Sequence, residues 1–521
     1  MNLFSKMVIG PLTGLALLAF PHAGSAAEST DFNLMEATIA DVHTAMRDGK
    51  LTARRLVEMY LARIDAYDKK GPALNAVILV NPSALEIADG LDAKFKASGP
   101  IGPLHGIPVL LKDNVNTASM PTTGGSLSLQ GYVPPEDASI VKKLTDAGAI
   151  VIAKTNLHEF AVWGETVSSL GGQTLNPYDL TRTPGGSSGG TGAGLAANFG
   201  LLGIGTDTIN SIRSPASANS LVGIRPTVGA VSRSGIIPYS FVQDAAGPLA
   251  RTVTDAVKML NALVAYDPAD PATAWSIGQL ERDYTQFLNA DGLKGARIGI
   301  VETLFGSQPV HQEVNTVVRE AITRMERAGA VMVPIRDAML DTNKLVAEVS
   351  VHLYDLKSDL NSYLSDPKAH APVKSLEEII ASGKFHPNIG DEIRRSQGLS
   401  QESPEYKDRL VKRMRLREKV MQIMAENRLD ALVYPHQQRL VVPVGARQAD
   451  RNGVLGSVTG FPAITAPGGF SPPTDTAPIG VPVGVEFLGR PWDEATLIRI
   501  AYSFEQATNF RRPPQSTPSL P

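Results

Sequence analysis

The sequence predicts an α/β fold, with one large domain in which α-helices cover both faces of a mixed β-sheet. Segments with helical periodicity alternate with short apolar segments along the chain, as such a fold requires. No internal repeat and no linker rich in proline, glycine and serine divides the 521 residues into independent halves. Hydrophobic residues make up 43% of the chain, which is enough for one large packed core.

The predicted elements begin near the N-terminus with a helix and a strand. Thr52 can cap a helix, because its hydroxyl can accept from a free N–H group of the first turn. The apolar face of this helix carries Leu56, Tyr60 and Ile64, spaced by four residues. The apolar run 75–80 that follows is a predicted strand. The later predicted elements are helix 138–147, strand 150–152, strand 298–301, helix 312–328, helix 404–427, strand 431–434 and helix 493–507.

The two ends of the chain are expected to lie outside this domain, which we place at residues 28–510. Residues 1–27 have the features of a signal peptide: Lys6 is their only charge, an apolar stretch of about 14 residues follows it, and residues 25–27 are small. A membrane span needs roughly 20 apolar residues, so we expect no membrane anchor and an exported protein, either periplasmic or secreted. Residues 511–521 contain four prolines and are expected to be a disordered tail.

Composition excludes several classes of function. The chain carries 49 Lys+Arg against 52 Asp+Glu, so it has no basic bias toward nucleic acid or an anionic membrane. It has no cysteine, which excludes a thiolate nucleophile, a disulfide framework and a Cys-ligated metal. His105 and His158 lack the paired spacing of metal ligands, and we expect neither a metal nor another cofactor. An enzyme of this sequence needs an oxygen nucleophile.

The most informative segment is 183–194, which packs six glycines and the two adjacent serines Ser187 and Ser188 into twelve residues. So much glycine indicates that the backbone approaches another group closely or adopts unusual dihedral angles. A phosphate-binding loop is disfavoured, because the glycines lack both a terminal Lys-Ser/Thr pair and the G-x-G-x-x-G pattern after a strand. A nucleophile elbow formally fits 185–189, but two prolines and several polar residues precede it where an apolar strand is needed. A flexible loop explains the composition but not the segment that lies 24 residues further on.

That later segment runs from Thr206 to Arg213 and reads Thr-Asp-Thr-Ile-Asn-Ser-Ile-Arg, and an apolar run upstream of the glycines ends at Lys112. Together these three pieces resemble the amidase signature family, in which a lysine, a Gly-Gly-Ser-Ser-Gly-Gly loop and a Thr-Asp-x-x-x-Ser-Ile-Arg segment occur in this order. The resemblance implies the amidase signature fold and an amide hydrolase. It extends over nearly the whole mature chain, including residues 124–126, 153–160, 247–251, 460–464 and 482–485.

The resemblance assigns a role to each member of a Ser-Ser-Lys triad. Ser211 is the nucleophile, Ser187, which follows a cis peptide bond, is the bridging serine, and Lys112 is the base. A serine hydroxyl needs a neighbour that removes its proton, and a lysine does this only when it is neutral. Burial of Lys112 behind apolar residues would lower its pKa toward the working pH. The expected reaction is hydrolysis of a carboxylic amide through an acyl-enzyme on Ser211, releasing a carboxylate and ammonia or an amine.

The resemblance also places an oxyanion hole at the backbone N–H groups of Thr208, Ile209, Asn210 and Ser211. The commonest pattern of the family has Gly-Gly where this chain has Ile209-Asn210. A β-branched residue is strained at positive φ, so either Ile209 adopts ordinary dihedral angles or the hole is altered. Backbone donors do not depend on the side chain, so we expect the hole to be retained and Ile209 to shape the pocket.

Three charged residues next to the triad are expected to be structural. Asp207 and Arg213 flank the Ser211 loop and are expected to support it through an ion pair or hydrogen bonds. Asp113 follows Lys112 directly, and because successive strand residues point to opposite faces, we expect it to point away from the site.

The sequence leaves the substrate and the assembly open. The predicted partner is a small-molecule amide, with the pocket walled by residues 337–427 together with 120–123 and 238–242; whether the amide is aliphatic, aryl, peptide or carbamate-like is open. A homodimer also stays open. Two alternatives within the family are an amidotransferase A-type subunit, which supplies ammonia for tRNA-dependent amidation, and a catalytically inactive binding protein. The export signal and the absence of a basic bias argue against the first, and the intact triad argues against the second.

Overall fold

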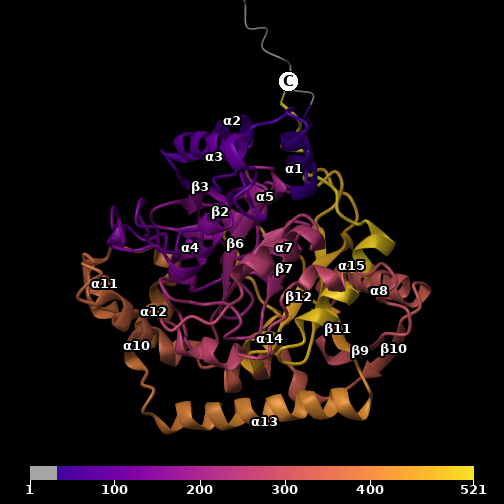
Figure 1. The fold of residues 1–521 in the computed structure, drawn as a ribbon. Helices are drawn as coiled ribbons and strands as arrows, with labels where there is room; N and C mark the ends of the chain where they lie inside the picture. Colours follow the sequence, from indigo (N-terminus) through magenta and orange to yellow (C-terminus); the bar gives the residue numbers. More distant parts are fainter. Residues whose placement is uncertain (1–31, 521) are drawn as a thin grey trace, which may run out of the picture.

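A mixed sheet of eleven strands forms the centre of the computed structural model, which describes residues 32–520 (Figure 1). The predicted signal peptide, residues 1–27, lies outside the described residues. In chain order the strands of this sheet are β1 (Val77–Val80), β2 (Pro108–Lys112), β3 (Ile150–Thr155), β6 (Leu202–Asp207), β7 (Val222–Arg225), β8 (Ala245–Ala250), β9 (Arg297–Val301), β10 (Val331–Ile335), β11 (Ala431–Pro435), β12 (Ala463–Phe470) and β13 (Pro482–Leu488). A separate two-stranded sheet pairs β4 (Val167–Ser168) with β5 (Gly172–Gln173).

The strands are ordered β1-β3-β2-β6-β8-β7-β12-β13-β11-β9-β10 across the sheet. Parallel pairs join β2 to β3 and β6, and β9 to β10 and β11. The remaining neighbours are antiparallel, so the sheet is mixed, as predicted. The Lys112 strand therefore lies directly beside the strand that leads to Ser211, although 75 or more residues separate Lys112 from both serines.

Helices cover both faces of this sheet (Figure 1). On β11, Ala431 and Val433 belong to one hydrophobic cluster with α8 (Gln312–Arg327) and α15 (Glu494–Thr508). Leu432 and Tyr434 belong to another, with α13 (Pro404–Glu426) and α14 (Val454–Thr459). Since successive side chains of a strand point to opposite faces, the two clusters lie on opposite sides of the sheet. The other helices are α1 (Ile39–Arg47), α2 (Ala53–Tyr67), α3 (Ala84–Ser98), α4 (Ser139–Asp146), α5 (Gly189–Ala196), α6 (Arg213–Ala218), α7 (Val253–Leu263), α9 (Thr342–Lys344), α10 (His352–Leu364), α11 (Leu376–Ser382) and α12 (Gly390–Gly398).

The predicted elements each overlap an observed one. The predicted helix 404–427 is α13, and Ser403 caps it by accepting from the N–H of Tyr406. The predicted helix 138–147 is α4, and the predicted strand 75–80 contains β1. Helices α10, α11 and α12 belong to neither of the two clusters on the sheet. They form a third hydrophobic cluster with residues such as Phe160 and Tyr239. Three residues of this third cluster, Ala161, Val162 and Tyr239, also line the cavity described below.

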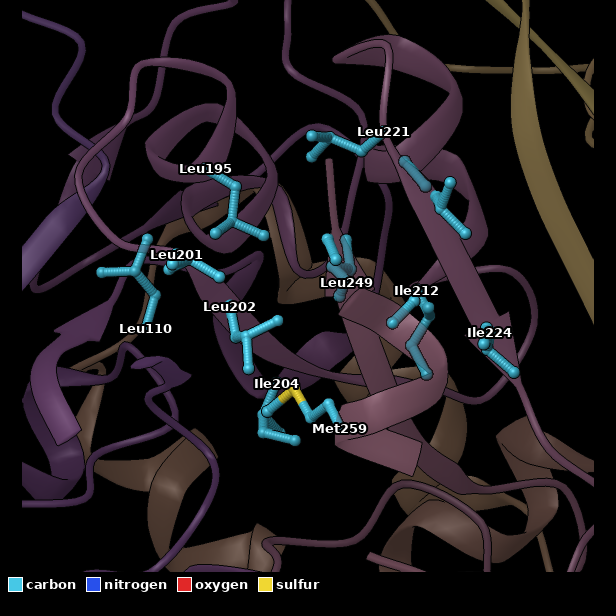
Figure 2. Packing of buried hydrophobic residues seen from close by; sticks show 14 of the residues in the cluster. Leu110, Leu195, Leu201, Leu202, Ile204, Ile212, Leu221, Ile224, Leu249 and Met259 are labelled. Atoms are coloured by element: carbon cyan, nitrogen blue, oxygen red, sulfur yellow. The ribbon is translucent and has the colours of Figure 1, made fainter. Parts of the chain in front are cut away.

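The glycine-rich segment is packed inside the protein. All eight residues of α5 are buried, and Leu195 packs with Leu110 of β2 and Leu202 of β6 (Figure 2). A Cβ atom on Gly190 would overlap the carbonyl oxygens of Asn156 and Ala76. Gly185 has φ +70°, a conformation that glycine adopts without strain. Close backbone approach and unusual dihedral angles therefore both account for the glycines.

The C-terminal segment 511–520 lies against the body of the fold, which differs from the disorder expected from its prolines. Arg63 of α2, which is buried, donates to the carbonyl oxygens of Thr517 and Pro518 at 2.8 Å each. Arg511 forms an ion pair with Glu36 at 2.7 Å. A buried guanidinium needs acceptors, and the backbone of the tail provides two of them, beside the carbonyl oxygens of Ala197 and Asn198. No local pattern indicates this contact, because more than 450 residues separate Arg63 from its two acceptors in the tail.

Candidate active site

Lys112 is the last residue of β2 and is fully buried between β3 and β6. Its Nζ lies 2.7 Å from Ser187 Oγ and 2.8 Å from Thr206 Oγ1. Burial lowers the pKa of Lys112 to about 7, although Asp207 and Asp244 act in the opposite direction. At neutral pH much of this amine is therefore uncharged and has a lone pair that can accept a proton from Ser187.

Ser187 lies in the glycine-rich loop, and the peptide bond that precedes it is cis. Its side chain is fully buried. The hydroxyl of Thr166 donates to the carbonyl oxygen of Gly185 at 2.7 Å, and the N–H of His158 donates to the carbonyl oxygen of Ser187 at 3.0 Å. These contacts hold the loop so that the Ser187 hydroxyl faces Lys112.

Ser211 lies in the loop between β6 and α6, so a buried strand leads into the loop and a helix follows. The carbonyl oxygen of Ser211 accepts from the N–H of Ser188 at 3.3 Å, which joins this loop to the glycine-rich loop. The residue is 4% exposed and lines a cavity. Among the described residues, no hydrogen bond joins the Ser211 hydroxyl to Ser187, so the structure brings the three residues together but bonds only Lys112 to Ser187.

The predicted oxyanion-hole residues form the tight turn after β6. No acceptor in residues 32–520 engages the backbone N–H groups of Thr208, Ile209, Asn210 and Ser211, so these donors are available to a ligand. Ile209 and Asn210 both have negative φ, so the turn is built without the strain that a β-branched residue would have at positive φ. The Ile209 side chain is 7% exposed and lines the cavity. Thr208 is anchored by its hydroxyl, which donates to Asp244 at 2.6 Å.

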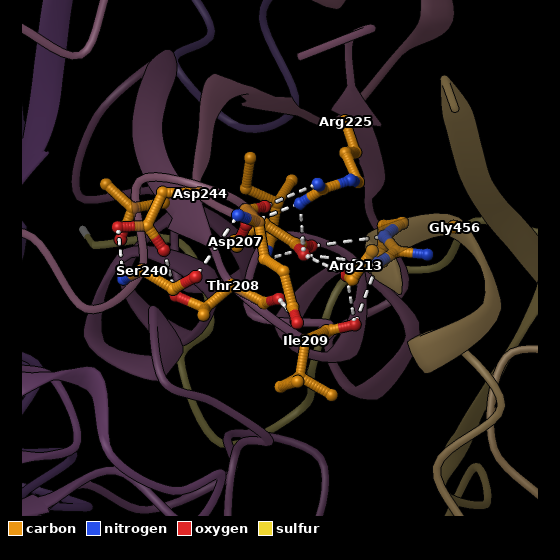
Figure 3. Close-up of polar contacts among 12 residues, drawn as sticks. Asp207, Thr208, Ile209, Arg213, Arg225, Ser240, Asp244 and Gly456 are labelled. Atoms are coloured by element: carbon orange, nitrogen blue, oxygen red, sulfur yellow. Dashed lines mark hydrogen bonds and ion pairs between the residues drawn. The ribbon is translucent and has the colours of Figure 1, made fainter. Parts of the chain in front are cut away.

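A buried charge network supports this turn (Figure 3). Asp207 accepts from the N–H of Ile212 at 3.0 Å and from Arg213 Nε at 3.1 Å, so the ion pair expected from the sequence is present. Arg225 donates to the same carboxylate at 2.9 Å, and Arg213 also bonds Glu486 of β13. Burial alone would raise the pKa of Asp207, but Arg213 and Arg225 outweigh it and hold this pKa below its usual range. The carboxylate therefore stays charged and fixes the turn.

Replacing Asp207 with alanine is expected to lower the free energy of unfolding by about 3 to 5 kcal/mol, because buried Arg225 would lose its carboxylate partner and buried Arg213 would keep only Glu486. Urea unfolding measures this change. Arg324→Ala is the matched control: the Arg324–Glu320 pair is about half exposed, and its loss should cost less than about 1 kcal/mol. Equal losses in the two variants would contradict a structural role for Asp207.

The cavity beside Ser211 has a volume of about 330 Å³. Part of its wall comes from the predicted segments 337–427 and 238–242, but residues 120–123 do not line it. Two contributions were not predicted, residues 161–163 and Arg451. The remaining lining residues are Thr208, Ile209, Asn210, Tyr239, Val346, Ala347, Ser350, His352, Leu353, Tyr354, Glu392, Arg395 and Arg409.

Other candidate residues lie outside the cavity. Asp113 points away from Lys112 and forms an ion pair with buried Lys154 at 3.4 Å. His105 packs against Phe95, and the Nδ1 atom of His158 accepts from the N–H of Glu165 at 3.1 Å. Within the described part of the chain, no group of three or more His, Asp or Glu residues is placed to hold a metal ion. None of the described helices is both long and apolar enough to cross a membrane.

Fold and site together define an amide hydrolase of the amidase signature type, and comparisons with known proteins agree. The Amidase family profile matches residues 55–498. A probable amidase of Arabidopsis thaliana is 37% identical and covers 94% of each chain. An A-type subunit of glutamyl-tRNA(Gln) amidotransferase, from Thermoanaerobacter pseudethanolicus, is 33% identical and covers 93% of this chain and 99% of its own.

A solved structure points to the same family. The native peptide amidase of Stenotrophomonas maltophilia superposes with a TM-score of 0.82 and 38% identity, covering 92% of this chain and 99% of the other. This protein therefore belongs to the amidase family, and it hydrolyses amides.

Proposed function

We propose that this amidase removes ammonia from the terminal amide of peptides or peptide-like compounds, with Ser211 as the nucleophile, Ser187 as the proton carrier and Lys112 as the base. The observation that carries the mechanism is the hydrogen bond between buried Lys112 and Ser187, next to a cavity that Ser211 lines. The similarity to a peptide amidase supports the substrate class. A volume of about 330 Å³ fits the end of a small amide, which supports a small-molecule substrate.

The first half of the reaction acylates Ser211. Its oxygen attacks the amide carbon while its proton passes to Ser187 and the proton of Ser187 passes to neutral Lys112. The negative charge moves to the carbonyl oxygen, which the N–H groups of Thr208, Ile209, Asn210 and Ser211 stabilise. The proton then returns from Lys112 through Ser187 to the leaving nitrogen, the C–N bond breaks, and ammonia departs.

The second half repeats these steps with water. Lys112, again neutral, removes a proton from the water through Ser187, and the water oxygen attacks the ester carbon. Collapse of the second intermediate breaks the bond to Ser211, whose oxygen regains a proton. The products are a carboxylic acid, ionised in solution, and free Ser211. No step needs a group other than these side chains, backbone donors and water.

The purified chain alone is expected to release ammonia from N-acetyl-phenylalaninamide and from short peptide amides. A coupled ammonia assay measures this, with the corresponding free acids as blanks. The amidotransferase alternative predicts the opposite, because a subunit of that kind works within an assembly. Ammonia release that depends on added partner subunits would contradict the proposed hydrolase.

We also propose that the protein is exported, on the basis of residues 1–27. Expression of the full chain should yield a mature protein whose N-terminus lies near residue 28 and which fractionates with exported proteins. A mature protein that begins at Met1 contradicts export.

A further inference from the structure

Arg451 lines the same cavity as Ser211, yet its side chain forms no hydrogen bond and no ion pair with any residue in the described chain. Its guanidinium lies 4.7 Å from the centre of the Trp163 ring. Its Nη1 is 3.4 Å from the position of a Cβ on Gly164, and a Cβ on Gly186 would touch the Gly164 backbone. The guanidinium therefore lies next to the loop that carries Ser187, with its donors unused.

The nearby carboxylates are engaged by a second arginine. Arg447 also lies over the Trp163 ring, at 4.8 Å, but it does not line the cavity. It lies 3.8 Å from Glu165 and 3.8 Å from Glu392. The two arginines on one indole thus have different surroundings: Arg447 forms ion pairs with two carboxylates, whereas Arg451 is attracted by Glu165 without pairing with it and lines the cavity.

Other polar groups of the cavity have unused capacity as well. The hydroxyl of Tyr239 and both amide atoms of Asn210 are buried without a hydrogen-bond partner in the part of the chain that is described. Tyr239 is 2% exposed and Asn210 is 1% exposed, and both line the cavity. Buried polar groups without partners are costly, so this arrangement is typical of a site that a polar ligand completes.

A single scissile amide does not bind all of these unpartnered polar groups at once. Its carbonyl oxygen belongs to the N–H groups of the Ser211 turn, which leaves Arg451 for a second acceptor. A carboxylate there would meet charges of both signs, because Glu392 lines the cavity together with Arg395 and Arg409. A neutral carbonyl accepts from a guanidinium without repulsion by Glu392, and the peptide group of the proposed substrate supplies such a carbonyl one residue before the scissile amide.

We propose that Arg451 is a specificity-determining residue that donates to a second carbonyl oxygen on the acyl side of the substrate and so selects amides of N-acylated amino acids over amides of plain acids. The inference rests on the proposed function and deepens it. The Trp163 ring supports the plane of the guanidinium, so that its donors are held in one direction.

A matched pair of substrates tests the inference. N-Acetyl-phenylalaninamide carries the second carbonyl, and hydrocinnamamide lacks only the acetylamino group. Arg451→Met should lower kcat/KM about 10- to 100-fold more for the first compound than for the second, because only the first loses a hydrogen bond to a charged donor. Arg451→Lys, which keeps the charge but not the planar fork, should give an intermediate ratio.

Arg447→Met is the control, because it removes the other arginine from the same indole and should leave the ratio of the two kcat/KM values unchanged. An equal fall on both substrates in Arg451→Met overturns the inference, as does a wild-type enzyme that cleaves hydrocinnamamide better. A benzylsuccinamic acid has a carboxylate in place of the acetyl carbonyl. If Arg451→Met lowers kcat/KM more for this compound than for the N-acetyl compound, the choice of a neutral carbonyl is overturned. A wild-type enzyme that cleaves none of these compounds contradicts the proposed function itself. Thermal unfolding of each variant verifies that it is folded.

Discussion

Replacing Ser211 with alanine is expected to lower kcat for a simple aryl amide about 10⁴- to 10⁶-fold. The variant keeps the cavity and the backbone donors of the turn, but it has no oxygen that can form an acyl-enzyme. The residual rate would come from the oxyanion hole and substrate binding alone. Product release under single-turnover conditions measures the change, and mass spectrometry of the quenched wild-type enzyme should detect an acyl adduct that the variant lacks.

Ser188→Ala is the matched control for this result. Ser188 is also buried and belongs to the loop that contacts Ser211, but its hydroxyl contacts the backbone of Thr206 at 3.3 Å and does not line the cavity. Its loss should change kcat far less than the loss of Ser211. An active Ser211→Ala enzyme would show that another group is the nucleophile.

Replacing Lys112 with methionine is expected to lower kcat/KM about 10²- to 10⁴-fold and to remove a titration from the pH profile. In the wild-type enzyme the pKa of Lys112 is lowered to about 7, and only the neutral amine accepts a proton. The rate should therefore rise about tenfold per pH unit below this pKa and become level above it. The variant should have no such inflection, because methionine does not titrate.

Lys154→Met is the control that distinguishes the loss of the titrating base from the loss of any buried lysine. Lys154 is fully buried too, but it pairs with Asp113 and donates to the carbonyl oxygen of Val115 at 2.7 Å. Its variant should lose stability, since Asp113 would be left without its partner, yet it should keep the inflection near pH 7. An inflection that persists in Lys112→Met assigns the titration to another group and refutes Lys112 as the base.

The sequence predicts the local elements of this fold better than their arrangement. Helix 404–427 and strand 431–434 follow from the spacing of apolar residues, which is a property of neighbouring residues. The order of the strands is not local: β7 and β8 lie between β6 and β12, and nothing in their composition specifies which neighbours they pair with. Tertiary packing decides that order.

The candidate site likewise has residues that the sequence predicts and residues that only the folded chain shows. The resemblance identifies Lys112, Ser187 and Ser211 because they lie in recognisable segments. Arg225 binds the Asp207 network from 18 residues further on, without a motif that marks it. Glu486 binds the network from a strand far along the chain, and its only sign is its place directly after the segment 482–485. Arg451 and Trp163 lie in segments without such a motif, so only the folded chain shows that they face one cavity.

The register between β2 and β6 limits the insertions and deletions that the enzyme tolerates. Leu111 is paired with Ile204, and this pairing brings Lys112 to Thr206 and Ser187, while Asp113 points to the other face. Deleting one residue from β2 would shift Asp113 into the position of Lys112, so that a carboxylate would replace the amine beside Ser187. Insertions and deletions should therefore be excluded from this strand even where substitutions of its apolar residues are accepted, and the distance between Lys112 and Ser211 is a property of strand alignment.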